Sequence, residues 1–384
     1  MIKRVVRFLS YVLVAALASG ITFGLMQPET VAPEISKLDQ LEALIEERFI
    51  GEVDTVAIED AAADAMVEAL GDRWSYYIPQ DEYETYLEQM MNAYVGIGVT
   101  ITATEDSTGV NVVEVTKGGP AEEAGILVGD RIIAVAGQSI MGMTTTDTRN
   151  LVRGETGTFV DITVLREGAE LTFSVERRRL EIPVAEGEML DGNIGLITIS
   201  NFDARCAKET IAMIEELMDQ GAEKLIFDVR NNPGGYASEL VKLLDYLLPE
   251  GELFHMEHYT GEETFDYSDA DCLEIPMAVL VNADSYSAAE FFAVALQEYE
   301  AGIVVGEKTS GKGYFQTTIE LVDSSAVGLS VGKYYTPSGL SLEGVGITPD
   351  VEVYVDQETY ELITYNRLAH EEDPQLQAAI EALK

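Results

Sequence analysis

The sequence is poor in cysteine and in basic residues, and each shortage removes a class of protein. Cys206 and Cys272 are the only cysteines among 384 residues, and their separation fits neither a disulfide framework nor a set of metal ligands. We expect two free thiols. Only 24 lysines and arginines face 68 acidic residues, so the formal net charge is −44. Phosphate backbones repel a surface of that charge, and nucleic acid is therefore not an expected partner.

The N-terminus is the exception to this acidic composition. Lys3, Arg4 and Arg7 precede an uncharged apolar run over residues 8–26, which is long enough to cross a bilayer. Basic residues before such a run orient the following chain away from the cytoplasm. We expect an uncleaved, single-pass signal anchor in the cell membrane with an extracytoplasmic body. The alternative is a cleaved signal peptide and a secreted protein.

The pattern of apolar, polar and turn-forming residues changes along the chain and predicts five regions. They are a cytoplasmic stub, anchor and linker at 1–33, a helical segment at 34–93, a β-rich module at 94–178, an α/β core at 179–355 and a helical tail at 356–384. Strands and helices alternate in the core, which predicts a parallel sheet with right-handed crossovers. In the β-rich module, Gly96-Ile97-Gly98-Val99 fits either a backbone nest that binds a carboxylate or a plain tight turn.

Three loops of the core follow predicted strands, where α/β proteins bind their ligands. They contain "RNNPGG" at 230–235, "DSYS" at 284–287 and "GEKTSGKGYFQ" at 306–316. The third loop has the G-x-x-x-x-G-K spacing of a phosphate-binding loop. Such a loop needs a hydroxyl residue after its lysine and then a helix, whereas Gly313 and a strand-like sequence follow Lys312. Nucleotide binding is therefore not predicted.

Ser287 offers Lys312 a different role. Ser287 opens a predicted helix 25 residues before Lys312, a distance that one helix and one strand would fill. A lysine whose pKa is lowered can deprotonate a serine hydroxyl. The spacing of Ser287 and Glu290 also predicts a capping box, so a purely structural role for Ser287 stays open. The two roles are compatible, since a helix N-terminus favours a developing oxyanion. None of the histidines, His255, His258 and His370, has positional support in a catalytic triad.

With these residues the sequence resembles the carboxyl-terminal processing peptidases, a family of tail-specific serine proteases. The resemblance runs from about residue 37 to 352 and follows the order of the family's motifs. They are "LGDRWSYY", "VGIGV", "GGPAEEAGILVGDRIIAVAG", "VRGETGT", "DVRNNPGG", "SYSAAE", "GEKTSGKGYFQ", "YYTPSG" and "GVGITPDV". The resemblance implies an α/β protease core of the ClpP/crotonase type with an inserted PDZ domain. It implies no metal or organic cofactor.

The resemblance also implies a role for individual residues. Ser287 matches the family's nucleophile, Lys312 its general base, and Gln316 the residue that orients the lysine. The implied oxyanion donors are the backbone N–H of Ala288 and that of a glycine in the pair Gly234 and Gly235. The implied carboxylate loop of the PDZ domain is Gly96, Ile97, Gly98 and Val99, and Arg153 is a hypothetical link between that domain and the active site.

The sequence departs from the family's pattern near the nucleophile. Tyr286 and Ala289 interrupt its alternating serines, and Ser310 stands where an aromatic residue is common. Ser285 therefore remains an alternative nucleophile. We expect an endopeptidase that recognises free C-terminal tails of proteins and cleaves through an acyl-enzyme. The competing class is a non-catalytic PDZ scaffold or regulator. The substrate, the tail preference, any homo-oligomer and any gating by the PDZ domain are not determined by the sequence.

Overall fold

The computed structural model describes residues 36–104, 106–365 and 367–384. The predicted anchor at 8–26 lies outside these residues. Among the helices that the structure does describe, none is both long enough and apolar enough to span a membrane. The chain divides into two compact units, residues 1–62 and 63–384, and each is described by itself.

The first unit contains a helix and most of a second one. Helix α2 (Lys37–Arg48) starts at Ser36, which exchanges two 3.1 Å hydrogen bonds with Asp39 in a capping box. Helix α3 (Thr55–Glu68) crosses the boundary between the units. Both helices agree with the amphipathic periodicity of the sequence. In the second unit, the third expected helix of this region is α4 (Gln80–Met90).

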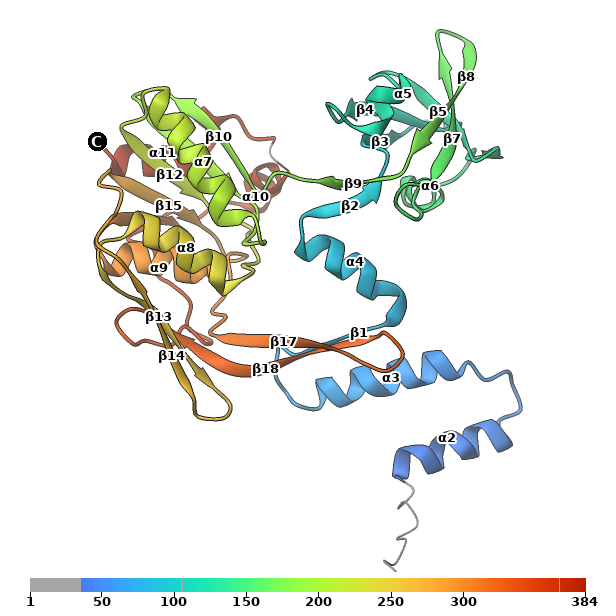
Figure 1. The fold of residues 1–384 in the computed structure, drawn as a ribbon, viewed down its shortest axis with the longest axis horizontal. Helices are drawn as coiled ribbons and strands as arrows, with labels where there is room; N and C mark the ends of the chain where they lie inside the picture. The colour runs from blue at the N-terminus through green and yellow to red at the C-terminus, as the bar shows by residue number, and fades with distance from the viewer. Residues whose placement is uncertain (1–35, 105, 366) are drawn as a thin grey trace, which may run out of the picture. The chain divides into compact units, whose positions relative to one another are not determined.

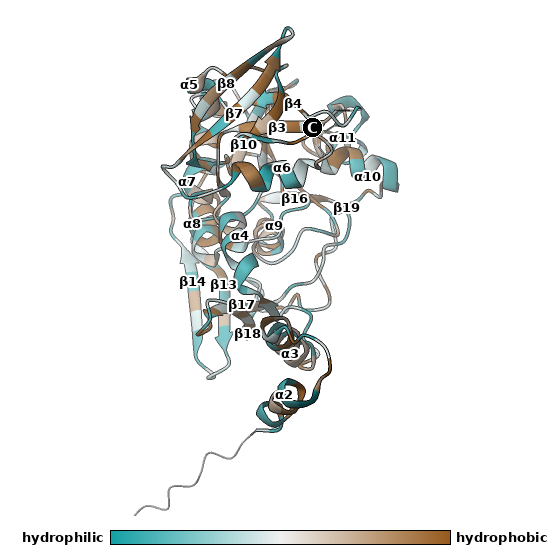
Figure 2. Ribbon diagram, turned by 90° about the vertical axis from the view of Figure 1, so that its right-hand side faces the viewer, coloured by the Kyte–Doolittle hydropathy of each residue, from teal (hydrophilic) through white to brown (hydrophobic). Residues whose placement is uncertain are grey.

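The β-rich module folds into an antiparallel sheet with the strand order β3-β4-β5-β7-β8, and β6 pairs with β5. Its elements are β3 (Val99–Ala103), β4 (Val110–Val115), α5 (Pro120–Ala124), β5 (Arg131–Val135), β6 (Gln138–Ser139), α6 (Thr145–Val152), β7 (Phe159–Arg166) and β8 (Ala169–Glu176). Buried valines and isoleucines such as Val110, Ile132 and Ile162 form its core, and β4 is accordingly brown in the hydropathy colouring of Figure 2. Strand β3 pairs only with β4, so it forms an edge of the described sheet.

The core sheet has the order β10-β11-β12-β15-β16-β19 and is parallel except for β10. Its strands are β10 (Ala185–Leu190), β11 (Ile194–Ile199), β12 (Lys224–Asp228), β15 (Met277–Val281), β16 (Gly302–Gly306) and β19 (Val351–Glu352). Helices α7 (Cys206–Asp219), α8 (Ala237–Leu247) and α9 (Ala288–Glu298) cover one face, and α11 (Pro374–Ala382) covers the other (Figure 1). Side chains alternate between the faces: Phe227 packs with the three helices, and Ile226 packs on the side of α11.

A second sheet of the core has the order β1-β18-β13-β14, and β17 pairs with β18. Its strands are β1 (Tyr76–Ile78), β13 (Gly251–His258), β14 (Glu263–Ser268), β17 (Tyr314–Glu320) and β18 (Ala326–Tyr335). Two further strands, β2 (Ala93–Gly96) and β9 (Arg178–Glu181), pair with each other at the two ends of the β-rich module. The strand-like sequence after Lys312 forms β17, as predicted, whereas β9 and β10 were not predicted from the sequence.

The helical tail that we expected over 356–384 is interrupted. It contains α10 (Gln357–Thr364), the 3-10 turn η1 (His370–Glu372) and α11. Asp373 caps α11, and Pro374 occupies its first turn. Proline lacks the N–H that a continuing helix requires, so it starts a new helix here. The two cysteines are free, as expected, and Cys206 is buried.

Candidate active site

The three loops singled out in the sequence lie at the same edge of the core sheet. Strands β12, β15 and β16 are parallel neighbours in the order of the sheet, and their carboxyl ends are Asp228, Val281 and Gly306. The loops that follow them therefore begin side by side. The strand after Lys312 is β17, which confirms that this loop lacks the helix of a phosphate-binding loop.

Glu290 joins two of these loops through one buried carboxylate. Its side chain is fully buried. One carboxylate oxygen, Oε2, accepts hydrogen bonds from the backbone N–H of Ser287 at 3.0 Å and of Lys312 at 2.8 Å. The other, Oε1, accepts from Gly311 N at 2.8 Å and from Thr309 Oγ1 at 2.5 Å. Burial raises the pKa of Glu290, and these hydrogen bonds oppose the shift. The backbone N–H groups of Ser287 and Lys312 are thus both held by Glu290 Oε2.

Ser287 has a backbone conformation that is rare outside glycine. It caps α9 with φ +58° and ψ −126°, and left-handed φ values are strained for residues with a side chain. The spacing to Glu290 works as the capping box predicted, since the Glu290 carboxylate accepts from Ser287 N. Gly234 lies against this turn, and a Cβ atom at Gly234 would come within 2.8 Å of Ser287 Cβ. The position therefore requires glycine.

The ammonium group of Lys312 lies beside two aromatic rings. Its Nζ is 5.1 Å from the ring centroid of Trp74 and 5.5 Å from that of Tyr286. Burial lowers the pKa of Lys312, while the charges of Asp72, Glu290 and Glu343 raise it by a smaller amount. Among the residues that the structure describes, no carboxylate forms an ion pair with Nζ and no hydrogen bond joins it to Ser287. The site therefore favours a lysine that gives up its proton more readily than an exposed one.

Trp74 and Glu343 complete the surroundings of Lys312 and were not assigned to the site from the sequence. Trp74 Nε1 donates a 3.0 Å hydrogen bond to Glu343, which also accepts from Gly313 N at 2.9 Å. The Trp74 ring stacks on Tyr286 at 6.1 Å between centroids. Trp74 is the only tryptophan of the chain and lies in the quoted "LGDRWSYY". The presence of so rare a residue in this motif is the sequence feature that could have assigned it to the site.

The structure distinguishes between the two glycines considered as oxyanion donors. The N–H of Gly234 donates to Asn232 Oδ1 at 2.8 Å. Over residues 36–104, 106–365 and 367–384, no acceptor is hydrogen-bonded to the N–H of Gly235 or of Ala288. Gly235 is therefore a better candidate donor than Gly234, and it joins Ala288 as an N–H available beside Ser287.

Two further residues do not form the contacts that their expected roles require. Gln316 Nε2 donates to Tyr314 O at 3.1 Å and to Ser330 Oγ at 3.0 Å, rather than contacting Lys312. Ser285 is fully buried, and its hydroxyl donates to Val229 O at 2.7 Å. A hydroxyl committed to a backbone carbonyl is poorly placed to attack a substrate, so Ser285 is the weaker candidate nucleophile.

A small apolar cavity adjoins Ser287. Its volume is about 10 Å³, which is room for one group the size of a water molecule or a methyl. Phe254, Phe291 and Tyr334 supply most of its aromatic wall. Over the described ranges, no group of three His, Cys, Asp or Glu side chains is arranged to hold a metal ion.

In the β-rich module, the candidate carboxylate loop connects β2 to the edge strand β3. Within the described part of the chain, the N–H groups of Ile97 and Gly98 have no hydrogen-bond acceptor. Such free donors beside an open strand edge suit a peptide that adds as a strand. Arg153 ends α6 and pairs with Glu88 of α4 at 3.2 Å, so it contacts neither Ser287 nor Lys312.

Comparison with known proteins identifies two families in the chain. Residues 193–353 match the model of peptidase family S41, and residues 112–166 match that of a PDZ domain. The carboxy-terminal processing protease CtpA of Bacillus subtilis is 32% identical over 364 residues, which are 91% of this chain and 78% of that protein. A CtpA-like serine protease of Staphylococcus aureus is 30% identical over 357 residues, with coverages of 92% and 70%. A solved structure of a protein assigned to the S41 proteases, from Bacteroides fragilis, has a TM-score of 0.53 at 17% identity, covers 89% of this chain and 96% of that one, and is similar in fold.

Proposed function

The chain belongs to peptidase family S41, among its carboxy-terminal processing serine proteases with a PDZ domain, and on this basis we propose that Ser287 and Lys312 form its catalytic dyad. One observation carries the proposal. Ser287 and Lys312 lie on loops from different strands, and yet their backbone N–H groups share the Oε2 atom of Glu290. Family membership also favours the peptidase over the alternative of a non-catalytic scaffold.

In the proposed reaction, Ser287 Oγ attacks the carbonyl carbon of the scissile peptide bond while Lys312 Nζ accepts its proton. The N–H groups of Gly235 and Ala288 donate to the oxyanion of the tetrahedral intermediate. The C–N bond then breaks, and the leaving amine takes the proton from Lys312. An acyl-enzyme on Ser287 remains. No hydrogen bond joins Nζ to Ser287 in this structure, so the proposed reaction requires a rotation of one or both side chains that brings Nζ to Oγ.

Hydrolysis of the acyl-enzyme uses the same base. Lys312 takes a proton from a water molecule, which attacks the ester carbonyl, and the proton then returns to Ser287 Oγ as the ester bond breaks. The lowered pKa of Lys312 supports this role, because the neutral amine is the form that accepts a proton. Gln316 retains its proposed orienting role only if that rotation brings Nζ to it, since its amide now contacts Ser330.

Substrate recognition is proposed to use two surfaces. The free N–H groups of Ile97 and Gly98 bind the C-terminal carboxylate of a protein tail, while β3 pairs with the tail as an added strand. The cavity lined by Phe254, Phe291 and Tyr334 receives the side chain on the acyl side of the cleaved bond. Its size favours alanine there, and a peptide with tryptophan at that position should be cleaved more slowly.

The dyad is tested by two substitutions and one matched control. Ser287→Ala and Lys312→Ala should each lower kcat by roughly 10³-fold or more, because the nucleophile and the base act as one unit and the loss of either disables the other. Lys308 lies on the same loop but is exposed, and Lys308→Ala should leave kcat unchanged. The measurement is cleavage of a fluorescence-quenched peptide with an internal alanine and an apolar C-terminal tail.

A covalent probe distinguishes the two serines. A serine-directed acylating probe should label Ser287 in the wild type, as mapped by mass spectrometry. Labelling of Ser285, or full activity of the Lys312→Ala variant, would contradict the dyad. A wild-type chain that binds the tail peptide without cleaving it would favour the non-catalytic scaffold over the peptidase.

A further inference from the structure

The C-terminal tail contacts both active-site loops at a single side chain. The hydroxyl of Tyr360, on α10, forms hydrogen bonds with Asn231 Oδ1 at 3.1 Å and with Asp284 Oδ2. Asn231 belongs to the loop after β12, and Asp284 belongs to the loop after β15. One proton is thus shared between acceptors on two loops, as in a three-centre hydrogen bond.

The two contacted residues lie close in the sequence to the groups of the proposed chemistry. Asn231 lies four residues before Gly235, and Asp284 lies three residues before Ser287. Asn282 joins the same loops beside them, since its Oδ1 accepts from Asn231 N at 2.9 Å and its Nδ2 donates to Asn231 Oδ1 at 2.9 Å. Tyr360 and Asn282 therefore both link the oxyanion loop to the nucleophile loop.

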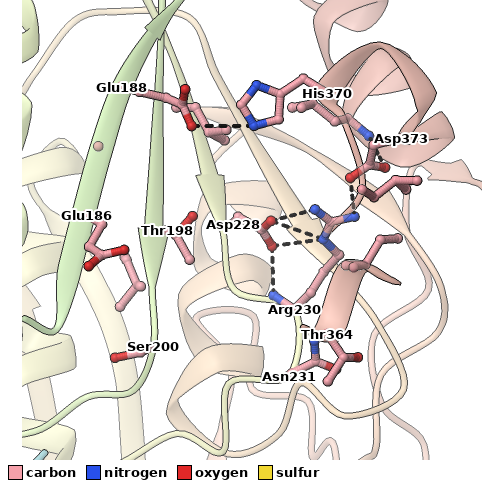
Figure 3. A pocket seen from close by; sticks show the side chains of 16 residues that line it. Glu186, Glu188, Thr198, Ser200, Asp228, Arg230, Asn231, Thr364, His370 and Asp373 are labelled. Atoms are coloured by element: carbon pink, nitrogen blue, oxygen red, sulfur yellow. Dashed lines mark hydrogen bonds and ion pairs between the residues drawn. The ribbon is translucent and has the colours of Figure 1, made fainter. Parts of the chain in front are cut away.

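A buried ion-pair cluster ties the tail to the residue preceding Asn231. Arg230 pairs with Asp228 at 2.6 Å and with Asp373 at 2.9 Å. The Arg230 and Asp373 side chains are only 6% and 7% exposed. Figure 3 shows the guanidinium of Arg230 between these two carboxylates, one from the end of β12 and one from the start of α11. The tail is thus anchored directly beside the oxyanion loop.

Helix α10 is only partly buried. None of its residues is fully buried, and a cavity of about 560 Å³ lies between part of the tail and strands β10 and β11. Thr364 and His370 line this cavity on the side of the tail (Figure 3). The hydrogen bonds of the Tyr360 hydroxyl are polar contacts that join α10 to the two loops.

We propose that Tyr360 is a positioning residue, which holds Asn231 and Asp284 so that the oxyanion donors and Ser287 face the same carbonyl group. The inference rests on the proposed chemistry of Ser287. Small displacements of groups around a reacting carbon reduce the rate of the chemical step far more than substrate binding. Loss of the hydroxyl should accordingly lower kcat and leave KM almost unchanged.

Tyr360→Phe, which removes only the hydroxyl, tests this role in the full chain. We expect kcat for the quenched peptide to fall about tenfold, with KM within about twofold and an unchanged Tm. Tyr354→Phe is the matched control, because the exposed Tyr354 also donates from its hydroxyl to a carboxylate, that of Glu352 at 2.9 Å. This control should retain the kcat of the wild type.

A double-mutant cycle separates positioning from general stabilisation. If Tyr360 acts through Asp284, Asp284→Ala should also lower kcat, and the double variant with Tyr360→Phe should be no worse than the slower single variant. Asp284→Asn, which keeps an acceptor, should restore most of the rate. Rates are divided by the number of active sites that the acylating probe labels, so that unfolded enzyme does not lower the apparent kcat.

The outcomes decide both proposals separately. Wild-type kcat per labelled site in Tyr360→Phe, or an equal loss in Tyr354→Phe, overturns the positioning role while the dyad stands. A fall in labelled sites that fully explains the lost activity also overturns it. A wild-type chain that neither cleaves nor labels overturns the proposed function itself.

Discussion

At the scale of single residues, burial and nearby charges have opposing effects on the pKa of Lys312. Burial beside Trp74 and Tyr286 lowers its pKa, and three carboxylates raise it. Asp72 is the strongest of the three. It is held in place by hydrogen bonds from Ser75 Oγ at 2.6 Å and from Trp74 N at 3.2 Å. The charge near the lysine can therefore be changed without altering the lysine itself.

Because burial and nearby carboxylates have opposing effects on the pKa of Lys312, we expect Asp72→Asn to shift the pH profile of the reaction. Wild-type kcat/KM should rise with pH as Lys312 loses its proton, since the neutral amine is the base. Removing the Asp72 charge lowers the pKa of Lys312 further, so the rising limb should move to lower pH. Asp323→Asn, on the turn between β17 and β18, should leave the limb in place. A limb that stays fixed or moves to higher pH in Asp72→Asn would refute Lys312 as the base.

Residue-level prediction from the sequence succeeded where a motif is local and failed where contacts are distant. Ser287 and Glu290 are three positions apart, and their predicted bond is present. Trp74 contacts Glu343, 269 positions away, and Tyr360 contacts Asn231, 129 positions away. No periodicity or spacing encodes such pairs, because the fold alone brings them together.

At the scale of elements, strong hydropathy patterns predicted the strands and helices well. The buried parallel strands β12 and β15 are continuous apolar runs, as both of their faces are covered. Strand β10, "AEGEML", lies at the edge of the sheet and has three exposed residues, so it carries little apolar signal. The break in the tail was missed although Pro374 marks it.

The edge strand β3 leads to a prediction for tail binding. A peptide with a free carboxylate should bind the chain, because the carboxylate accepts charge-assisted hydrogen bonds from the N–H groups beside Gly98. The same peptide with an amidated C-terminus should bind about tenfold more weakly, the equivalent of about 1.4 kcal/mol. Fluorescence polarisation with Ser287→Ala, which does not consume the peptide, measures both affinities.

Gly98→Ala provides the complementary change on the protein. Gly98 has φ +77°, and a Cβ there would lie 3.2 Å from Thr116, so alanine should distort the loop and weaken binding of the free carboxylate. Gly168→Ala, at a positive φ in the open turn between β7 and β8, is the control for backbone strain alone. Equal affinities for the acid and amide peptides would show that this loop is not the carboxylate site.

At the scale of the whole molecule, charge is distributed unevenly along the chain. The net charge is −44, although Lys3, Arg4 and Arg7 all precede the first apolar run. We propose that this asymmetry holds the N-terminus in the cytoplasm and the catalytic body outside it. In intact spheroplasts, an added protease should digest the body of the full chain and spare a tag at its N-terminus.

The charge asymmetry supplies the control for this orientation. Replacing Lys3, Arg4 and Arg7 together by glutamine should increase the fraction of chains whose body is protected from the added protease. A body that is already protected in the wild-type chain would contradict the extracytoplasmic location. Release of the body into the medium without detergent would instead indicate cleavage after the apolar run.

The position of Tyr360 and Asp373 in the chain affects the order of events during biosynthesis. Both follow every strand of the core sheet in the sequence, so a ribosome completes the oxyanion and nucleophile loops before it makes the helices that contact them. A nascent chain therefore passes through an interval in which its peptidase core is translated and the bond from Tyr360 to Asn231 and Asp284 does not yet exist.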